Sequence, residues 1–188
     1  MAKNGYHHGD LRAAMLTAAA EQIAADGVDA VSLRALARRA GVSHAAPAHH
    51  FGDRTGLLTA LAAEGFGRLA VALENATDPS AAAIAYIRFA LQHPGHFDVM
   101  FRHGLLRTDD ATLAAARARS SAALRSSVLE GQEVPASVDQ QAVQLAAWSL
   151  VHGFASLWRE GALEGAPLVS STDPEAAARR MLDTVRFE

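Results

Sequence analysis

Alanine occupies 43 of the 188 positions of this chain, and this feature restricts its fold more than any other. Alanine is the best helix former, whereas aromatic residues make up only 6% of the sequence and no run shows the alternation of a β-strand. Glycine and proline lie mainly between long stretches of alanine, leucine and arginine. The pattern therefore predicts an all-α protein.

Composition excludes several kinds of site and location. The sequence has no cysteine, which excludes a disulfide framework, a thiolate zinc site and a cysteine nucleophile. No apolar run approaches the ~18 residues of a membrane span, and the N-terminal segment MAKNGYHHGDLR lacks the apolar core of a signal peptide. We therefore expect a cytoplasmic protein without a membrane partner. The net charge of −3 gives no overall basic excess that would point to nucleic acid.

Charge is nevertheless distributed unevenly along the chain. Residues 1–60 carry six cations, five anions and five of the nine histidines, whereas the remaining residues carry eleven cations and fifteen anions. A slightly basic N-terminal part on an acidic body suggests two domains with different tasks. Helical patterns are predicted at 10–27, 32–40, 43–51, 53–75, 80–93, 94–103, 109–130, 137–161 and 174–186, with an irregular connection at 161–172.

Residues 32–51, SLRALARRAGVSHAAPAHHF, have the form of a helix-turn-helix. Ser32 is a good N-cap for the first helix, and the small side chain of Ala37 lets a second helix cross closely. Gly41 permits a sharp turn at little steric cost, and Leu36 and Val42 hold the two helices at a fixed angle. The second helix can then present its N-terminal half to the major groove of DNA.

Several segments resemble the TetR family of transcriptional regulators. Residues 5–75 are similar to its DNA-binding domain in the segments GYHHGDLR, ADGVDAVSLRALARRAGVS and HHFGDRTGLL. The segments FALQHPGHFDVMF (89–101) and WSLVHGFASLWREG (148–161) are similar to the TetR-like C-terminal domain named for its Trp-His-Gly signature. The resemblance implies a three-helix DNA-binding domain at 1–69 and a larger helical-bundle domain for effector binding and dimerisation at 80–188.

The resemblance also implies a recognition helix at about 43–50. The residues expected to meet operator DNA are Arg34, Ser43, His44, Ala45, His49, His50 and Arg54. Their chemistry fits, because a helix N-terminus offers free amides to a phosphate, arginines neutralise phosphates, and histidines donate to base edges.

Two residues depart from the family pattern. Ala48 stands where many relatives carry a tyrosine that touches the DNA backbone, so one phosphate contact is expected to be missing. Pro47 lies near the first turn of the recognition helix, where its ring is expected to tighten or distort the turn.

The C-terminal domain is expected to bind a small apolar effector. Candidate pocket residues are Phe89, Phe97, Met100, Phe101, Trp148 and His152. His152 follows Trp148 by one helical turn, so the two share a face, and core packing is the alternative role for this pair. A metal site built from the histidines at 93, 96, 103 and 152 is disfavoured, because their spacing matches no standard ligand motif.

The helix predicted at 137–161 is apolar on two faces, and a helix of this kind must be buried on both sides. One side can serve the domain's own core, and Gly153 would let a helix of another chain approach closely. We expect a homodimer through this helix and the last one, with Val143, Leu150, Gly153, Phe154 and Leu157 at the interface. Which face makes the dimer stays open, and a fully internal central helix is the alternative.

Together these patterns predict a homodimeric, ligand-responsive repressor that binds a palindromic operator, without cofactor, metal or catalytic residues. The sequence has no G-x-S-x-G, H-E-x-x-H, phosphate loop or dinucleotide fingerprint. An activator built on the same plan is one alternative. A small-molecule or metal-binding helical sensor without DNA function, and a helical enzyme, are the others. Salt-dependent binding to duplex DNA separates a regulator from both of these.

Overall fold

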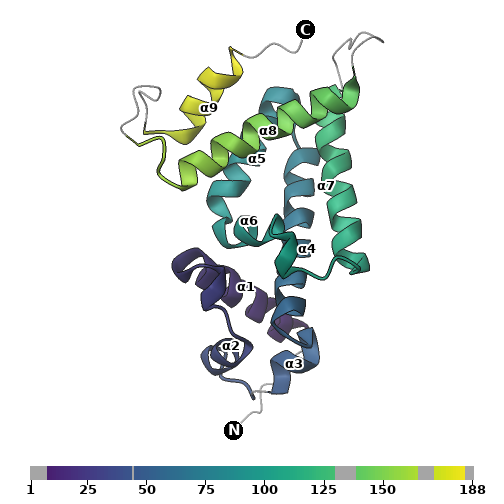
Figure 1. Cartoon of the computed structure of the whole chain (residues 1–188), viewed down its shortest axis with the longest axis vertical. Helices are drawn as coiled ribbons and strands as arrows, with labels where there is room; N and C mark the ends of the chain where they lie inside the picture. Colours follow the sequence, from purple (N-terminus) through teal and green to yellow (C-terminus); the bar gives the residue numbers. More distant parts are fainter. Residues whose placement is uncertain (1–7, 44, 130–138, 165–171, 185–188) are drawn as a thin grey trace. The chain divides into compact units, whose positions relative to one another are not determined.

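The computed structural model describes residues 8–43, 45–129, 139–164 and 172–184, and every element in this part of the chain is a helix (Figure 1). The all-α prediction is confirmed. The chain divides into two compact units, the first made of Met1–Phe66 and His93–Arg117 and the second of Gly67–Gln92 and Ala118–Glu188.

The first unit is built on α1 (His8–Asp26), which packs against α2, α3 and α6. Its other elements are η1 (Val28–Ala30), α2 (Leu33–Arg39), α3 (Ala45–Phe51), the first part of α4 (Arg54–Glu74), α6 (Pro94–Met100), η2 (His103–Leu105) and the start of α7 (Ala111–Leu129). Fully buried apolar side chains from several of these helices form its core, among them Met15, Leu16, Leu36, Leu57 and Met100. Burial of these side chains is what holds the short helices α2 and α3 in place.

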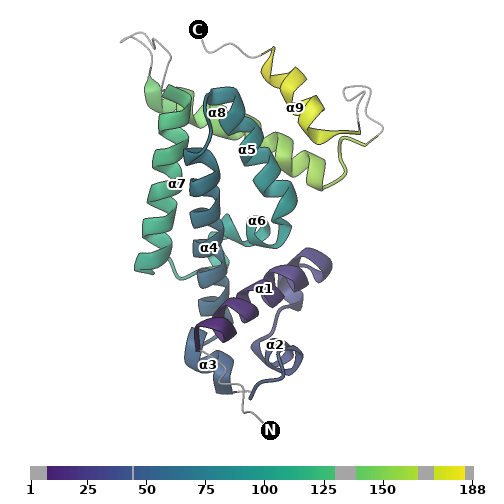
Figure 2. The same ribbon diagram turned by 180° about the vertical axis from the view of Figure 1, so that it is seen from behind.

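The second unit combines the rest of α4 and α7 with α5 (Pro79–Gln92), α8 (Gln140–Arg159) and α9 (Pro174–Leu182). Helix α5 packs against both α8 and α9 (Figure 2). Arg88 of α5 makes two hydrogen bonds of 2.7 and 2.8 Å to the carboxylate of Glu175 on α9. This paired contact lowers the pKa of Glu175 and joins the two helices at their surface.

Helix ends follow local signals that the sequence carries. Ser32 caps α2 by accepting a hydrogen bond from the amide of Ala35 at 3.2 Å, and Asp173 caps α9 by accepting one from Glu175 at 3.0 Å. The helix predicted at 94–103 instead ends at Met100 and is followed by the 3-10 turn η2. The ends of the helices predicted at 137–161 and 174–186, and most of the connection at 161–172, lie partly outside the described residues.

Helix α6 packs with the N-terminal helices in the first unit, although the predicted domain boundary assigned it to the C-terminal domain. Gly95 explains how it can do so, because a Cβ atom at this position would lie only 2.0 Å from the carbonyl oxygen of Ala20 on α1. Gly65 of α4 plays a similar part toward α6, since its Cβ would lie 2.7 Å from the sulfur of Met100. The missing side chains let α6 approach both helices closely.

Helix α4 is the one helix among the described residues that is long and apolar enough to cross a membrane. Most of its apolar stretch is buried inside the protein. It is therefore a core helix.

Candidate functional site

The turn between α2 and α3 has the geometry that the helix-turn-helix pattern predicts. Gly41 adopts a φ of +65°, in the left-handed region where residues with a side chain are strained. The amide of Val42 then donates to the carbonyl of Ala37 at 3.0 Å, which closes the turn. Ala37 and Leu36 are fully buried, and α2 packs against α3. The small residue at 37 and the glycine at 41 thus set the crossing of the two helices.

The outer face of α2 carries positive charge. Arg34 and Arg38 lie one helical turn apart and are exposed, and neither side chain forms a hydrogen bond or ion pair with any residue that the structure describes. The neighbouring Arg39 differs, because its guanidinium lies 2.7 Å from the carboxylate of Glu21 on α1. Two of the three arginines of α2 therefore present uncompensated charge to the solvent, where phosphate groups can bind.

Helix α3 exposes Ala45 and His49, whereas His50 is half-buried and its ring lies tilted against that of Phe51, with 6.2 Å between the ring centres. Phe51 is buried, and the guanidinium of Arg12 lies 5.7 Å from the centre of its ring. These contacts fix the C-terminal end of α3 on the first unit. Ser43 is exposed just before the helix, and its carbonyl accepts from the amide of residue 46 at 3.1 Å. His44 lies outside the described residues.

Pro47 is buried at the third position of α3, which runs as an α-helix through it. The first amides of a helix have no acceptor within the helix, so a proline here removes no hydrogen bond. The amide of Gly52 donates to the carbonyl of Ala48 at 2.8 Å and ends the helix. Pro47 therefore does not interrupt α3, and the bond from the amide of residue 46 to the carbonyl of Ser43 spans three residues, as in a tightened first turn.

Arg54 at the start of α4 is directed toward the protein's own backbone. Its guanidinium donates to the carbonyls of Val28 at 2.7 Å and Val31 at 3.1 Å, and it lies 3.6 Å from the carboxylate of Asp29. These bonds join α4 to η1. The expected phosphate contact of Arg54 stays a prediction. To make it, the guanidinium would have to bind a phosphate while it donates hydrogen bonds to two backbone carbonyls.

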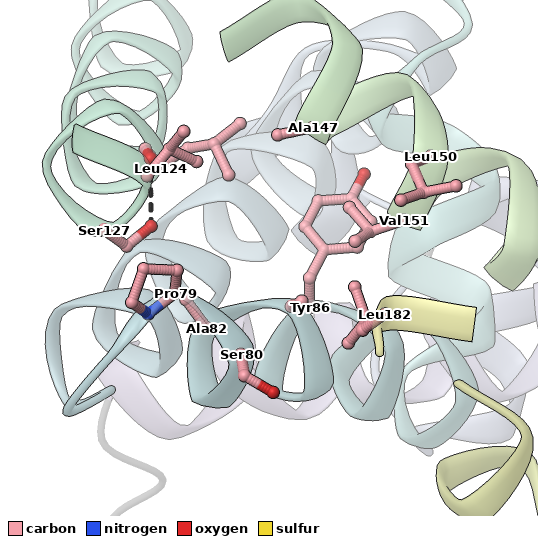
Figure 3. A pocket seen from close by; sticks show the side chains of 12 residues that line it. Pro79, Ser80, Ala82, Tyr86, Leu124, Ser127, Ala147, Leu150, Val151 and Leu182 are labelled. Atoms are coloured by element: carbon pink, nitrogen blue, oxygen red, sulfur yellow. Dashed lines mark hydrogen bonds between the residues drawn. The ribbon is translucent and has the colours of Figure 1, made fainter. Parts of the chain in front are cut away.

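The second unit contains a cavity of about 180 Å³ between α5, α7, α8 and α9 (Figure 3). The described residues that line it carry no charge, and two hydroxyl groups from serines are among them. The lining consists of Pro79, Ser80, Ala82, Ala83, Tyr86, Leu124, Ser127, Val128, Ala147, Leu150, Val151 and Leu182. A hollow with this lining suits a small neutral apolar molecule.

The six residues predicted to form an effector pocket do not gather around this cavity. Phe97, Met100 and Phe101 belong to the first unit, where the ring of Phe101 lies edge-on to Phe97 at 5.4 Å and to Phe66 at 5.6 Å. Phe89 is buried in the second unit without lining the cavity. The aromatic segment 97–101 packs with the N-terminal helices because Gly95 lets α6 approach α1.

Trp148 and His152 are not among the cavity-lining residues, but both contact Tyr86, which is. The hydroxyl of Tyr86 lies 2.9 Å from Nδ1 of His152 and accepts a hydrogen bond from Nε1 of Trp148 at 3.1 Å. Burial raises the pKa of Tyr86 and lowers the pKa of His152. Near neutral pH both groups are therefore uncharged, and the contact between Tyr86 and His152 is a hydrogen bond between a neutral phenol and a neutral imidazole.

The residues predicted for the dimer interface divide between two faces of α8. Phe154 is buried, Leu150 lines the cavity and Val143 is half-buried. Leu157 is 45% exposed, and a Cβ atom at Gly153 would meet no atom within 4 Å. Leu145, which is 59% exposed, lies on the same face as Gly153 and Leu157. This face, together with Ala142, Ala146 and Ser149, is the apolar side of α8 left open to solvent.

Two family profiles match the chain. Residues 80–185 match the profile described as "Tetracyclin repressor-like, C-terminal domain", which covers more than half of the chain. Residues 15–61 match "Bacterial regulatory proteins, tetR family". The chain belongs to the TetR family. It is a DNA-binding transcription regulator and not an enzyme.

Solved structures share the fold of this TetR-family regulator over most of its length. A protein of unknown function from Rhodococcus sp. RHA1 is 36% identical, with a TM-score of 0.78, 97% of this chain covered and 96% of the other. The TetR-family regulator PfmR from Thermus thermophilus is 24% identical, with a TM-score of 0.67 and coverages of 90% and 94%. The fatty acid degradation regulator FadR from Bacillus halodurans is 15% identical, with a TM-score of 0.67 and coverages of 93% and 99%. None of the curated proteins compared with the chain is similar enough in sequence to match.

Sequence reasoning missed the central residue of the cavity in this TetR-family regulator. Tyr86 is 1% exposed and lines the cavity, while its hydroxyl joins two residues of α8. A signal was present, since Tyr86 is the one residue with a phenolic hydroxyl in the apolar helix PSAAAIAYIRFALQ. A buried tyrosine usually has a hydrogen-bond partner, so its position predicts polar partners on a neighbouring helix.

Proposed function

We propose that this TetR-family regulator binds a palindromic operator as a homodimer and releases it when a small neutral apolar molecule occupies the cavity of the second unit. The observation that carries the operator contact is the exposed, uncompensated arginine face of α2 beside α3. A helix-turn-helix dimer reads two half-sites one helical turn of DNA apart, about 34–36 Å.

In the operator complex, Arg34 neutralises a phosphate while the exposed side of α3 enters the major groove. Ser43, Ala45, His49 and His50 supply the contacts from α3, together with His44. Arg54 meets a phosphate only with those donors of its guanidinium that the carbonyls of η1 leave available. Base specificity then rests on the histidines and on apolar contact of Ala45 with a thymine methyl group.

The homodimer forms through the open face of α8, defined by Leu145, Gly153 and Leu157. Large apolar side chains lie exposed on this face, which is typical of an interaction surface. The small residues beside them would let a helix of a second chain lie close. The burial of Phe154 and the place of Leu150 in the cavity lining support this choice of face, because both side chains are used inside the protomer. The C-terminal domain is of the Trp-His-Gly type, with Trp148 and His152 on the inner side and Gly153 on the outer.

The effector is a neutral molecule about the size of a substituted benzene. A cavity of roughly 150 Å³ lined by apolar side chains binds benzene in another protein, and the cavity here measures about 180 Å³. No charged side chain among the described lining residues would compensate a carboxylate or an ammonium group. The serine hydroxyls at 80 and 127 suit one polar substituent. Effector binding shifts the population toward dimers in which the spacing of the recognition helices no longer matches the operator. The protein then acts as a repressor that the effector releases from DNA. It does so in the cytoplasm.

The operator proposal is tested by selecting bound sequences from random DNA duplexes with the purified full chain. We expect a palindrome to be enriched, and its affinity to fall steeply with added salt. Replacing Arg34 by glutamine should weaken binding strongly, whereas Arg125→Gln, which removes one positive charge from an exposed position on α7 in the same way, should not. Enrichment of no sequence, or equal effects of the α2 and α7 variants, would contradict the proposal.

A further inference from the structure

An ion pair crosses the bend between α3 and α4, and one of its partners comes from far along the chain. Arg107 lies between η2 and α7, within the part of the chain that matches the C-terminal family profile. Its guanidinium nitrogen lies 2.9 Å from the carboxylate of Asp53, which belongs to the bend itself. Both residues are in the first unit. A residue outside the helix-turn-helix therefore reaches the point where the recognition helix ends.

Asp53 serves two partners at once. One carboxylate oxygen accepts from the amide of Gly56 at 2.8 Å and so caps α4, while the other oxygen faces Arg107. The bond from Gly56 and, after it, the bond from Arg107 lower the pKa of Asp53 below its usual value. Arg107 thus acts on the same side chain that starts α4.

The guanidinium of Arg107 also lies close to the backbone of two glycines, Gly52 and Gly56, where a side chain would crowd it. A Cβ atom at Gly52 would lie 3.4 Å from a guanidinium nitrogen of Arg107, and a Cβ at Gly56 would lie 3.3 Å from the guanidinium carbon. Gly52 has a φ of +76° and directly follows α3. Arg107 therefore covers both sides of the bend that sets the angle between α3 and α4.

The backbone of Arg107 is held as well as its side chain. Its amide donates to the hydroxyl of Thr59 at 2.9 Å, and that hydroxyl donates to the carbonyl of Thr55 at 2.7 Å. Thr59 is buried on α4. Two separate contacts, one through the backbone and one through the side chain, fix residue 107 against the first two turns of α4.

We propose that Arg107 is a positioning residue for operator binding, which holds the recognition helix α3 at its DNA-reading angle through Asp53. The proposal rests on the operator binding proposed above, and it requires no contact between Arg107 and DNA. The contrasting role is direct contact between Arg107 and a phosphate, with Asp53 competing for the guanidinium. The two roles predict opposite effects of removing the charge of Asp53.

The test measures the dissociation constant for the duplex that random-sequence selection enriches most, at several salt concentrations. The variants are Arg107→Gln, Asp53→Asn and the double variant, and asparagine keeps the cap of α4 because it is a good N-cap residue. We expect each single variant to weaken binding about fivefold, the upper end for a partly exposed ion pair. The double variant should be no weaker than either, since both changes break the same contact. The slope of log affinity against log salt should stay unchanged.

Direct phosphate contact would give a different pattern, and this pattern would overturn the proposal. Arg107→Gln would then reduce the salt slope by about one counterion, and Asp53→Asn would leave binding unchanged or tighten it. Unchanged binding in both variants, or effects that add in the double variant, would overturn it as well. A parent protein that enriches no duplex would instead contradict the operator proposal itself.

Two further variants separate positioning from loss of charge or of folding. Arg102→Gln, an equal charge change on an exposed side chain five residues earlier, should bind like the parent protein. Arg107→Lys restores the charge beside Asp53 but not the flat contact over the two glycines, so it should recover part of the affinity. Thermal unfolding of all variants should stay close to the parent, because both side chains of the pair are substantially exposed, at 44% and 63%. An Arg107→Lys variant as weak as Arg107→Gln would contradict the role of the ion pair.

Discussion

The hydroxyl of Tyr86 should contribute measurably to the stability of the second unit. Tyr86→Phe removes the acceptor of Trp148 Nε1 and the hydrogen-bond partner of His152 Nδ1 while leaving the ring in place. Each hydrogen bond contributes about 0.5–1.5 kcal/mol net, and the two half-buried partners can regain some hydration, so we expect a loss of about 1–2 kcal/mol. For a chain of this length, that loss corresponds to a fall of roughly 3–6 °C in Tm.

The assay is thermal unfolding of the parent, Tyr86→Phe, His152→Gln and the double variant, followed by circular dichroism at pH 5 to 8. Burial lowers the pKa of His152 below its ordinary value of 6.5, so the unfolded chain takes up this proton at a higher pH than the folded chain. The stability due to neutral His152 is therefore complete above pH 6.5 and is lost as the pH falls below it. His152→Gln should flatten this part of the pH profile, and the single effects should not add. A Tyr86→Phe variant with an unchanged Tm, or strictly additive effects, would refute the reasoning.

Three further predictions concern other parts of the chain. Gly41→Ala should destabilise the protein by about 1 kcal/mol, because φ is +65° although a Cβ would meet no atom, and an unchanged Tm would argue against strain at this turn. Gly153→Leu should leave the protomer folded but yield monomers in sedimentation analysis, whereas a persistent dimer would exclude this face of α8. Ala147→Phe should fill the cavity and abolish the response to effector while operator affinity stays the same, and a retained response would place the effector elsewhere.

Local signals in the sequence predicted helix ends and the turn of the helix-turn-helix. The caps at Ser32 and Asp173 and the glycine at 41 act on backbone within three or four residues, so the sequence carries them completely. The predicted fold class follows from the same kind of information, since alanine favours helix wherever it stands.

Contacts between distant residues were not predictable in this way. Tyr86 and His152 are 66 residues apart, and Arg54 bonds to a carbonyl 26 residues earlier. The predicted effector pocket combined Phe97, Met100 and Phe101 with residues at 89, 148 and 152, but the first three lie in the first unit, where Gly95 lets α6 approach α1, and the other three in the second. The direction in which an apolar helix is buried depends on which partner it can approach, and periodicity within one helix does not contain that information.

The contact between Gly95 and the backbone of α1 has a consequence for how the first unit tolerates change. Backbone touches backbone there with no side chain between, and a Cβ would lie 2.0 Å from the Ala20 oxygen. Because protein interiors are close-packed and hardly compressible, the two helices cannot move closer together at this point. A side chain added at position 95 would therefore have to force α6 and α1 apart, so the present spacing of the two helices admits only glycine there.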